Sequence, residues 1–250
     1  MNIAVVGDSC TDIYVYGSCH RLCPEGPVPV LNKTHQVDSG GMALNVFNNL
    51  QTFFGNNVDL YSNHNHMMKV RYVDEKTNQL LLRVDHNDSC DRISEASIEN
   101  IKREKYDAAV VSDYCKGFLI NEDLVELGRS SPLSFLDSKR KLTPDIVFSY
   151  NLIKLNEYEY SQNIKLVKES PKRFIITLGS KGVMFMDKIF PPPKLLQTYD
   201  VSGAGDTFLA AIVYQVMENN GIETAIQFAQ GCCNKVIQKR GTCVYKKDMD

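Results

Sequence analysis

The sequence lacks the features that mark several common classes of protein. No stretch approaches the roughly 18 consecutive apolar residues of a membrane-spanning helix, and residues 1–7 have neither the basic start nor the long apolar run of a signal peptide. Lys and Arg number 28 against 30 Asp and Glu, a net charge of −2, so no nucleic-acid surface is expected. We expect a soluble protein that binds neither membranes nor nucleic acids.

Cysteines are present but lack the spacing of a metal site or a disulfide framework. The 8 cysteines form no Cys-x-x-Cys pair and no cluster with histidine. Cys115, Cys232 and Cys233 lie among apolar or small residues, as is typical of buried thiols. This usage favours the reducing cytoplasm as the compartment.

Short apolar runs alternate with helical patterns along the 250 residues, a length that suits one sizeable domain. Runs of the kind found in strands buried on both faces occur at 3–6, 108–111 and 174–178, and more weakly at 135–136 and 146–148. Helical periodicity occurs at 42–54, 94–103, 121–128, 207–219 and 223–238. This alternation predicts an α/β fold with a doubly wound, mostly parallel sheet flanked by helices.

Two stretches depart from that rhythm. Residues 13–38 and 69–86 are rich in Val, Tyr and Leu with partial alternation, which indicates strands outside the main sheet. They are expected to form a small β-lid, either a flap over a cleft or a contact between subunits. Because no repeat or linker interrupts the chain, we predict a single domain, 1–250, with this lid.

A loop of small residues precedes the helical pattern near the C-terminus. Gly203, Ala204 and Gly205 are followed at once by Asp206. Such a loop leaves backbone N–H groups unpaired at a helix start, where the helix dipole favours negative charge. A carboxylate there is a candidate base beside a bound phosphate, which indicates phosphoryl transfer. An ordinary turn with an N-cap is the other interpretation of the same residues.

Other polar residues and glycines stand where the predicted strands end. Asp8, Asp113, Asp137 and Gly179 each follow an apolar run. In doubly wound sheets ligands collect beyond the carboxyl ends of the strands. These positions are therefore expected to share one cleft.

Two motifs together resemble the signatures of a known family. Residues 200–206 resemble the C-terminal signature, and residues 40–45 the N-terminal signature, of the ribokinase-like (pfkB) carbohydrate kinases. Within that family, residues 6–17, 21–30 and 112–117 are most similar to the heptose-7-phosphate kinase domain of ADP-heptose synthesis. The resemblance spans nearly the whole chain.

The resemblance implies an ATP-dependent kinase acting on a hydroxyl of a sugar or sugar phosphate. Asp206 would be the general base, and the N–H groups of Gly203, Ala204 and Gly205 would form the anion hole. ATP and Mg²⁺ are the implied cofactors, with K⁺ left open. The implied substrate-binding residues are Asp8, Asp12, Gly40, Gly41, Asn45, Arg83, Asp113 and Lys116. The implied ATP-binding residues are Thr177, Gly179, Gly182 and Asn234, and the metal-linked residues are Asn156, Glu159, Asp200 and Ser202.

Several alternatives stay open at this point. Asp8 also suits a strand-end cap, and Arg83 a solvated lid charge. The Asn-x-x-Glu motif fits Asn156 with Glu159, or an alignment that puts Lys154 at the asparagine position. The segment near 60–69 is short for the family, which leaves the lid geometry and a homodimer through the lid undecided. A kinase for another sugar or for a nucleoside, and a catalytically weak regulatory homologue that binds a sugar or nucleotide, remain the rival functions.

Overall fold

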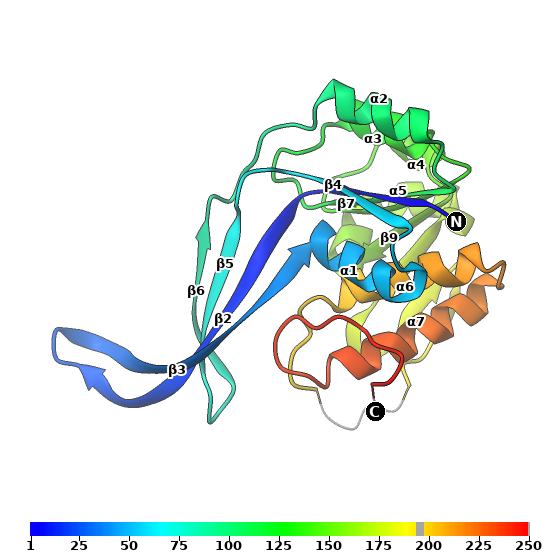
Figure 1. Cartoon of the computed structure of the whole chain (residues 1–250). Coiled ribbons are helices and arrows are strands. Elements are labelled where there is room, and N and C mark those ends of the chain that lie inside the picture. Colours follow the sequence, from blue (N-terminus) through cyan, green and yellow to red (C-terminus); the bar gives the residue numbers. More distant parts are fainter. Residues whose placement is uncertain (194–197, 250) are drawn as a thin grey trace.

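The largest element of the structure is an eight-stranded sheet (Figure 1). The structure is a computed structural model, and it describes residues 1–193 and 198–249. The strand order is β12-β11-β10-β9-β8-β7-β1-β4. The strands are β1 (Ile3–Gly7), β4 (Val58–Ser62), β7 (Ala108–Asp113), β8 (Leu133–Ser138), β9 (Leu152–Asn156), β10 (Phe174–Thr177), β11 (Val183–Phe185) and β12 (Lys188–Phe190). All pairs from β4 to β10 are parallel, and β11 and β12 add an antiparallel edge.

Helices cover both faces of this sheet (Figure 1). One face packs against α1 (Ala43–Phe54), α6 (Ala204–Met217) and α7 (Ile222–Val236). The other packs against α2 (Glu95–Glu104), α3 (Asn121–Gly128), α4 (Pro144–Ser149) and α5 (Glu157–Glu169). Two short 3₁₀ turns, Pro171–Arg173 and Gly179–Lys181, flank β10. In the part of the chain that the structure describes, no helix combines the length and apolar character needed to cross a membrane.

Strand β1 shows why the sequence folds this way. Its residues are all fully buried, with Ile3 and Val5 in one apolar cluster and Ala4 and Val6 in the other. A continuous apolar run is what a strand covered by helices on both faces requires. The predicted α/β architecture with a mostly parallel sheet is thus the one observed.

The local predictions missed three elements between β8 and β10. Residues 146–148, expected as a weak strand, lie in helix α4, which begins at an N-cap threonine: Thr143 Oγ1 accepts the Ile146 N–H at 3.4 Å. Pro144 occupies the first helical turn, where its missing N–H costs nothing. The strand β9 and the helix α5 were not predicted at all.

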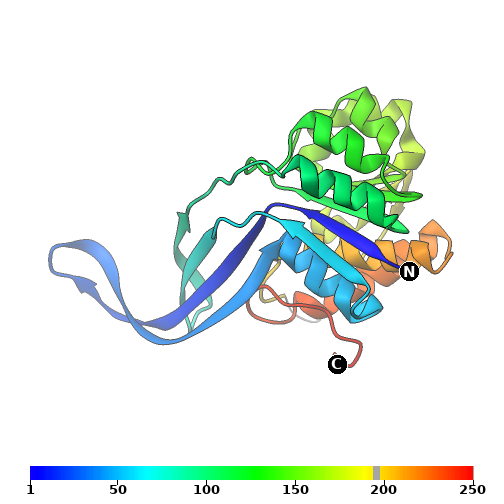
Figure 2. The same cartoon turned by 45° about the horizontal axis from the view of Figure 1, so that its top comes forward.

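A second, four-stranded sheet stands beside the main body (Figures 1 and 2). Its order is β3-β2-β5-β6, formed by β2 (Ser9–Cys23), β3 (Gly26–Met42), β5 (Met68–Asp74) and β6 (Gln79–His86). We call this sheet the lid. Strand β5 pairs with β2 only as far as Gly17, so β2 and β3 continue beyond it as a two-stranded hairpin over residues 18–33.

Short links join the lid to the body. Strand β2 follows β1 after a single residue, Asp8, and β3 runs directly into α1. Strand β4 is the last strand at one edge of the main sheet. It ends at Ser62, and the next strand, β5 of the lid, begins at Met68. The lid therefore meets the body at the carboxyl end of β1, next to the start of α6.

Candidate functional site

The first turn of α6 places Asp206 inside the protein. Gly203 is the N-cap residue, with a left-handed φ of 77° that glycine adopts without strain. Asp206 lies in the first turn and its side chain is buried, at 3% exposure. The predicted small-residue loop thus turns the chain so that a carboxylate enters the interior at a helix N-terminus.

Both carboxylate oxygens of Asp206 accept hydrogen bonds. Asn45 Nδ2 donates to Oδ2 at 2.9 Å, and the Tyr114 hydroxyl donates to Oδ1 at 2.9 Å. Burial raises the pKa of Asp206 to about 6, and the hydrogen bond from Asn45, like that from Tyr114, opposes this rise. At neutral pH the group is mostly ionised, yet it holds a proton more tightly than an exposed aspartate does.

A chain of side chains behind Asn45 fixes its orientation. Asn49 Nδ2 donates to Asn45 Oδ1 at 3.1 Å, which leaves Asn45 Nδ2 pointing at Asp206. Asn49 Oδ1 in turn accepts the Tyr245 backbone N–H at 2.9 Å and the Thr207 hydroxyl at 3.3 Å. The C-terminal segment therefore contributes, through Asn49, to the position of the Asp206 partner.

The start of α6 also presents a positively charged surface. Gly203 and Gly205 N–H groups have no acceptor among the described residues, whereas the Ala204 N–H donates to the Val201 carbonyl at 3.2 Å. The Lys154 ammonium lies 3.0 Å from the position that a Cβ on residue 205 would occupy. Two of the three predicted anion-hole N–H groups are thus available, beside an ammonium group.

Lys154 belongs to a row of alternating charges at the ends of β8 and β9. Lys154 Nζ donates to Asp137 Oδ2 at 2.6 Å, and Lys139 Nζ donates to Glu159 Oε1 at 2.5 Å. Lys139 Nζ also lies 3.9 Å from Asp137 Oδ1, a buried oxygen that accepts no hydrogen bond from a described residue. Burial by itself would lower the pKa of Lys139. The negative charges of Asp137 and Glu159 raise it by more than burial lowers it, so the pKa of Lys139 lies above its ordinary value.

The Asn-x-x-Glu motif forms a capping box at the start of α5. Asn156 Oδ1 accepts the Glu159 N–H at 2.8 Å, and Glu159 Oε2 accepts the Asn156 N–H at 2.7 Å. In the rival alignment Lys154 would pair with Glu157, but Glu157 forms an ion pair of 2.7 Å with Lys181. Asn156 and Glu159 are therefore paired with each other in the structure, and a role of either alignment at a metal stays a prediction.

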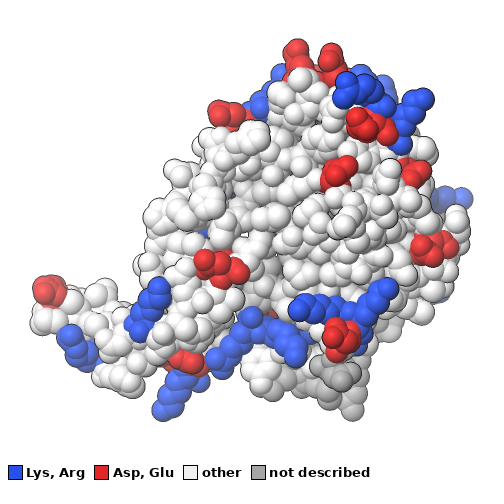
Figure 3. Space-filling model, viewed as in Figure 1, with Lys and Arg blue, Asp and Glu red and all other residues white. Residues whose placement is uncertain are grey.

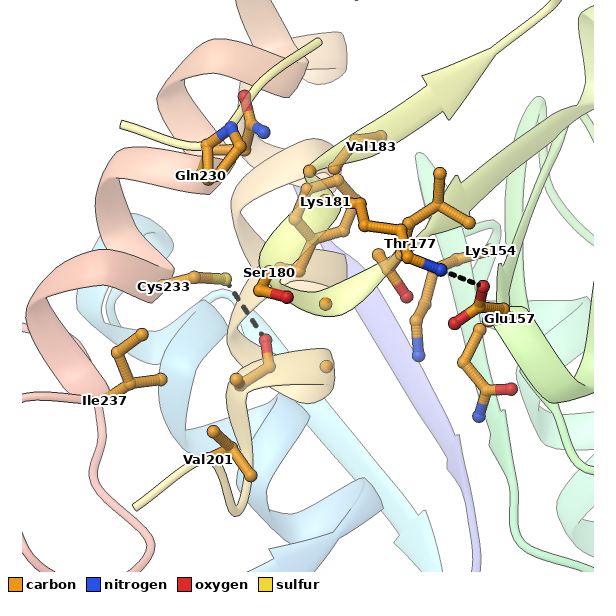
Figure 4. Close-up of a pocket in the computed structure, with 18 of the residues that line it drawn as sticks. Lys154, Glu157, Thr177, Ser180, Lys181, Val183, Val201, Gln230, Cys233 and Ile237 are labelled. Atoms are coloured by element: carbon orange, nitrogen blue, oxygen red, sulfur yellow. Dashed lines mark hydrogen bonds and ion pairs between the residues drawn. The ribbon is translucent and has the colours of Figure 1, made fainter. Parts of the chain in front are cut away.

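A cleft of ≈ 1120 Å³ opens next to this row of charges. Figure 4 shows Cys233 of α7 and Ile237, the residue just after α7, on one side and Thr177, Lys154 and Glu157 on the other. The predicted ATP-binding residues Thr177, Gly179, Gly182 and Asn234 all line it. Asn234 Oδ1 is buried and without a partner among the described residues, so the cleft contains an unused hydrogen-bond acceptor.

Of the residues predicted to bind the sugar, Asp12, Gly40 and Gly41 lie in the lid strands and are not part of the cleft wall. Asp12 of β2 is 7% exposed and accepts from Arg71 at 2.5 Å and from the Thr242 hydroxyl at 3.3 Å. Gly40 and Gly41 lie near the end of β3, next to Asp12. A Cβ on Gly41 would overlap Asp12 Oδ2. Glycine is therefore required where this backbone approaches the Asp12 carboxylate.

Four other predicted substrate residues are engaged with protein groups. Asp8 accepts the backbone N–H groups of Tyr114 at 2.6 Å, Lys116 at 3.2 Å and Phe118 at 3.3 Å. Burial and the charge of Asp113 raise the pKa of Asp8. Asp113 forms an ion pair with Arg140. Arg83 forms one with Asp85 at 2.6 Å, and Lys116 forms one with Asp88 at 2.5 Å. Asp8 and Asp113 thus hold the loops at this edge of the sheet, and their roles in substrate binding stay predictions.

The residues predicted to bind a monovalent cation lie just before α6. Asp200 Oδ1 accepts the Ser202 N–H at 2.8 Å. In the described part of the chain, no group of three or more His, Cys, Asp or Glu side chains is arranged to hold a metal ion. A K⁺ site at Asp200 and Ser202 stays a prediction.

Sequence reasoning missed several residues that the structure brings to the site. Tyr114, Asn49 and Lys139 are reached only through contacts between distant segments, and none belongs to a signature quoted for catalysis; Lys154 was considered only as the asparagine position of the rival Asn-x-x-Glu alignment. Tyr114 sits in the Ser112–Gly117 stretch already noted for its resemblance, and Lys139 follows Asp137 at a strand end. Those placements were the only local signals of their importance.

Comparison with known proteins agrees with this arrangement. Residues 151–248, which include the α6 loop and most of the cleft, match the model of the pfkB family of carbohydrate kinases. This part of the chain is thus similar to the pfkB family carbohydrate kinases. The bifunctional protein HldE of Aliarcobacter butzleri is 28% identical over 301 aligned positions, covering 99% of this chain and 63% of that protein. The chain thus spans less than two thirds of the length of this relative.

Solved structures confirm the ribokinase-like fold. Escherichia coli phosphofructokinase-2, determined in complex with potassium, superposes with a TM-score of 0.72 at 15% identity, covering 98% of this chain and 96% of that one. Arabidopsis thaliana ribokinase with ribose and ATP gives a TM-score of 0.68 at 15% identity, with 96% and 93% covered. The HldE alignment is longer than the 250 residues of this chain, so that relative carries residues in the matched region that are missing here.

The Tyr114 hydrogen bond yields a testable prediction about Asp206. In Tyr114→Phe the carboxylate loses one donor, so its pKa should rise above about 6, by roughly 1 unit for the loss of a hydrogen bond to a charged group. A ¹³C NMR titration of the aspartate carboxyl carbons measures this midpoint. Tyr150→Phe is the matched control, because its buried hydroxyl donates to the Leu124 carbonyl instead. An unchanged Asp206 midpoint in Tyr114→Phe would show that the hydrogen bond does not tune this group.

Proposed function

We propose that this chain is an ATP-dependent kinase that transfers the γ-phosphoryl group to a hydroxyl of a sugar or sugar phosphate. The observation that carries the proposal is the position of Asp206. It is a buried carboxylate with a pKa of about 6, and it follows directly after Gly205, which lines the open cleft. Such a group suits the removal of a proton from an alcohol that attacks a phosphate.

The cleft accounts for the nucleotide. Its volume of ≈ 1120 Å³ accommodates a nucleotide, and Asn234 Oδ1 offers an acceptor for an exocyclic amine of the base. The opposite end of the cleft reaches Gly205, Lys139 and Lys154, where cations and free N–H groups face the space. We place the base of ATP near α7 and its phosphates at the start of α6.

Phosphoryl transfer then needs alignment, charge neutralisation and a base. The N–H groups of Gly203 and Gly205, with the Lys154 ammonium, stabilise charge on the transferring group. Tyr114 or Asn45 would give up its hydrogen bond to one Asp206 carboxylate oxygen, and that oxygen would then accept the proton of the sugar hydroxyl. Those two donors hold the carboxylate in one orientation until the acceptor hydroxyl arrives.

Mg²⁺ would be bound at the row of charges beside the cleft. Asp137 Oδ1 is buried without a hydrogen-bond donor, and Glu159 presents a second carboxylate on the far side of Lys139. Hard oxygen ligands of this kind fit Mg²⁺. When bound, the ion would neutralise the β- and γ-phosphate oxygens of ATP.

The acceptor sugar is proposed on the resemblance of three stretches and of the HldE relatives. Residues 6–17, 21–30 and 112–117 are most similar to heptose-7-phosphate kinases, so we propose phosphorylation of a heptose phosphate at the anomeric hydroxyl. Another sugar or a nucleoside is the alternative acceptor. A regulatory homologue without turnover is less well supported, because the buried base and the free N–H groups are both in place.

Replacement of the base tests the proposed function. In Asp206→Asn, kcat with ATP and a heptose 7-phosphate should fall by about 10²–10⁴-fold, the usual contribution of a general base. Nucleotide binding, measured by calorimetry, should be retained because Asp206 does not line the cleft. Asp187→Asn, an exposed aspartate in the turn between β11 and β12, is the matched control. Equal turnover in Asp206→Asn and the wild-type protein would remove Asp206 as the base.

We further propose that two copies pair through the lid. The two-stranded hairpin has no third strand over residues 18–33, and isolated hairpins are only marginally stable in water. Leu22 and Val28 on this hairpin are 63% and 55% exposed, and Leu80 and Leu82 of β6 are 52% and 56% exposed. Figure 3 shows acidic and basic side chains on the visible face of the hairpin, with uncharged residues between them. A second copy would cover these apolar groups.

Sedimentation measurements test the lid contact. The wild-type protein should sediment as a dimer at micromolar concentration, and the double variant Leu22→Glu, Val28→Glu should sediment as a monomer. Met186→Glu is the control, since Met186 is 42% exposed but lies in the body between β11 and β12. A wild-type monomer, or a dimer that the lid variant leaves intact, would contradict pairing through the hairpin.

A further inference from the structure

Lys69 is a buried lysine that none of the roles described above uses. It lies on β5 of the lid and is only 9% exposed. Its ammonium lies 5.6 Å from the centre of the Tyr114 ring, and the hydroxyl of that ring donates to Asp206. One tyrosine side chain therefore separates the Lys69 ammonium from the base.

The neighbouring basic side chains are all paired with carboxylates. Arg71 binds Asp12 at 2.5 Å, Arg83 binds Asp85 at 2.6 Å, and Lys116 binds Asp88 at 2.5 Å. Lys69, in contrast, has no carboxylate oxygen within 4.0 Å among the residues that the structure describes.

The lid register explains why Lys69 is left without a partner. Its cross-strand neighbours are Asp12 on β2 and Asp85 on β6. Both carboxylates are already taken by the arginines on the same face of the sheet. Lys69, Arg71 and Arg83 thus face Asp12 and Asp85, three positive charges against two negative ones. The excess positive charge resides on the most buried of the three cations.

An uncompensated ammonium in this position is costly. A buried charge destabilises the folded protein unless an opposite charge or hydrogen bonds replace the lost water. The Tyr114 ring supplies only a cation–π contact. An anion that enters beneath the lid would supply the missing partner.

The position of Lys69 also assigns that anion to the acceptor rather than to the nucleotide. The cleft for the nucleotide is lined by Lys139, Lys154 and Lys181, whereas Lys69 is not part of its wall. Lys69 instead lies on the lid strand next to Asp12, on the predicted sugar side. Tyr114 stands between the two halves, with Lys69 at 5.6 Å and Lys139 at 5.1 Å from its ring centre.

We propose that Lys69 binds an acidic group of the acceptor sugar, a phosphate or a carboxylate, and so selects acidic over neutral acceptors. The selection of acceptors for phosphorylation rests on the proposed kinase function, whereas the binding of an acidic sugar by Lys69 does not. Among the described residues, Lys69 is the buried cation of this lid face without an ion-pair partner. The acid group of the sugar would supply that partner through a charge-assisted hydrogen bond.

The test compares acceptors that differ only in charge. Initial rates are measured with D-glycero-D-manno-heptose 7-phosphate and its neutral parent, and with D-mannose 6-phosphate, D-mannose and D-mannonate. In Lys69→Met the ratio of kcat/KM for a phosphorylated sugar to that for its neutral parent should fall about 10–100-fold, the range of one hydrogen bond to a charged group. If the ratio falls only for the phosphorylated sugars against their neutral parents, the acidic group that Lys69 binds is a phosphate. If the ratio falls only for mannonate against mannose, the group is a carboxylate.

Two further variants make the result specific. Lys69→Arg should restore much of the ratio, because it keeps the charge. Lys76→Met, an exposed lysine of the β5–β6 turn, should leave both the ratio and the activity unchanged. An unchanged ratio in Lys69→Met would overturn the proposal.

Equilibrium binding separates this proposal from the kinase function. If no sugar is turned over, calorimetry with mannose 6-phosphate is done on the wild-type protein and on Lys69→Met. Binding that the variant weakens about 10–100-fold supports the Lys69 site while the proposed reaction fails. Absence of binding to the wild-type protein, or equal binding to both, overturns the Lys69 site.

Discussion

The burial of the Asp206 carboxylate at the first turn of α6 is the constraint on which the rest of the site depends. A carboxylate that loses water must be stabilised by donors or become protonated, and here Asn45 and Tyr114 supply the donors. These two residues come from opposite sides of Asp206, one from α1 and one from the loop after β7. The Asp206 carboxylate is therefore held only when both signature regions and this loop are in place together.

Charged side chains are arranged around the buried Asp206 carboxylate. The helix N-terminus and Lys154 favour an anion in front of Asp206, while Asp137 and Glu159 balance the two lysines beside it. Burial strengthens each of these interactions relative to water. A phosphate at the start of α6 would thus meet a field that attracts it, next to a group that accepts protons near neutral pH.

Sequence reasoning predicted the main sheet because its strands are apolar on both faces, as β1 shows. It named Asp206 and Asn45 as candidates because each lies in a local motif, and the structure places the two side chains in contact. It missed α4 because a run of only three apolar residues does not distinguish a strand from a helix. It missed Tyr114 and Lys69 because their roles depend on contacts across the fold: Tyr114 meets Asp206 over 92 residues of sequence. Such contacts have no periodicity and no fixed spacing, so only the structure could show them.

In the proposed reaction the nucleotide lies in the cleft beside α7 and the acceptor lies under the lid. The most direct measurement is phosphorus NMR of a reaction containing the purified protein, ATP, Mg²⁺ and D-glycero-D-manno-heptose 7-phosphate. The account predicts that ADP appears together with a new phosphate ester on the anomeric carbon. An unchanged ATP spectrum with this acceptor and with every other sugar phosphate, neutral sugar and nucleoside supplied would contradict it.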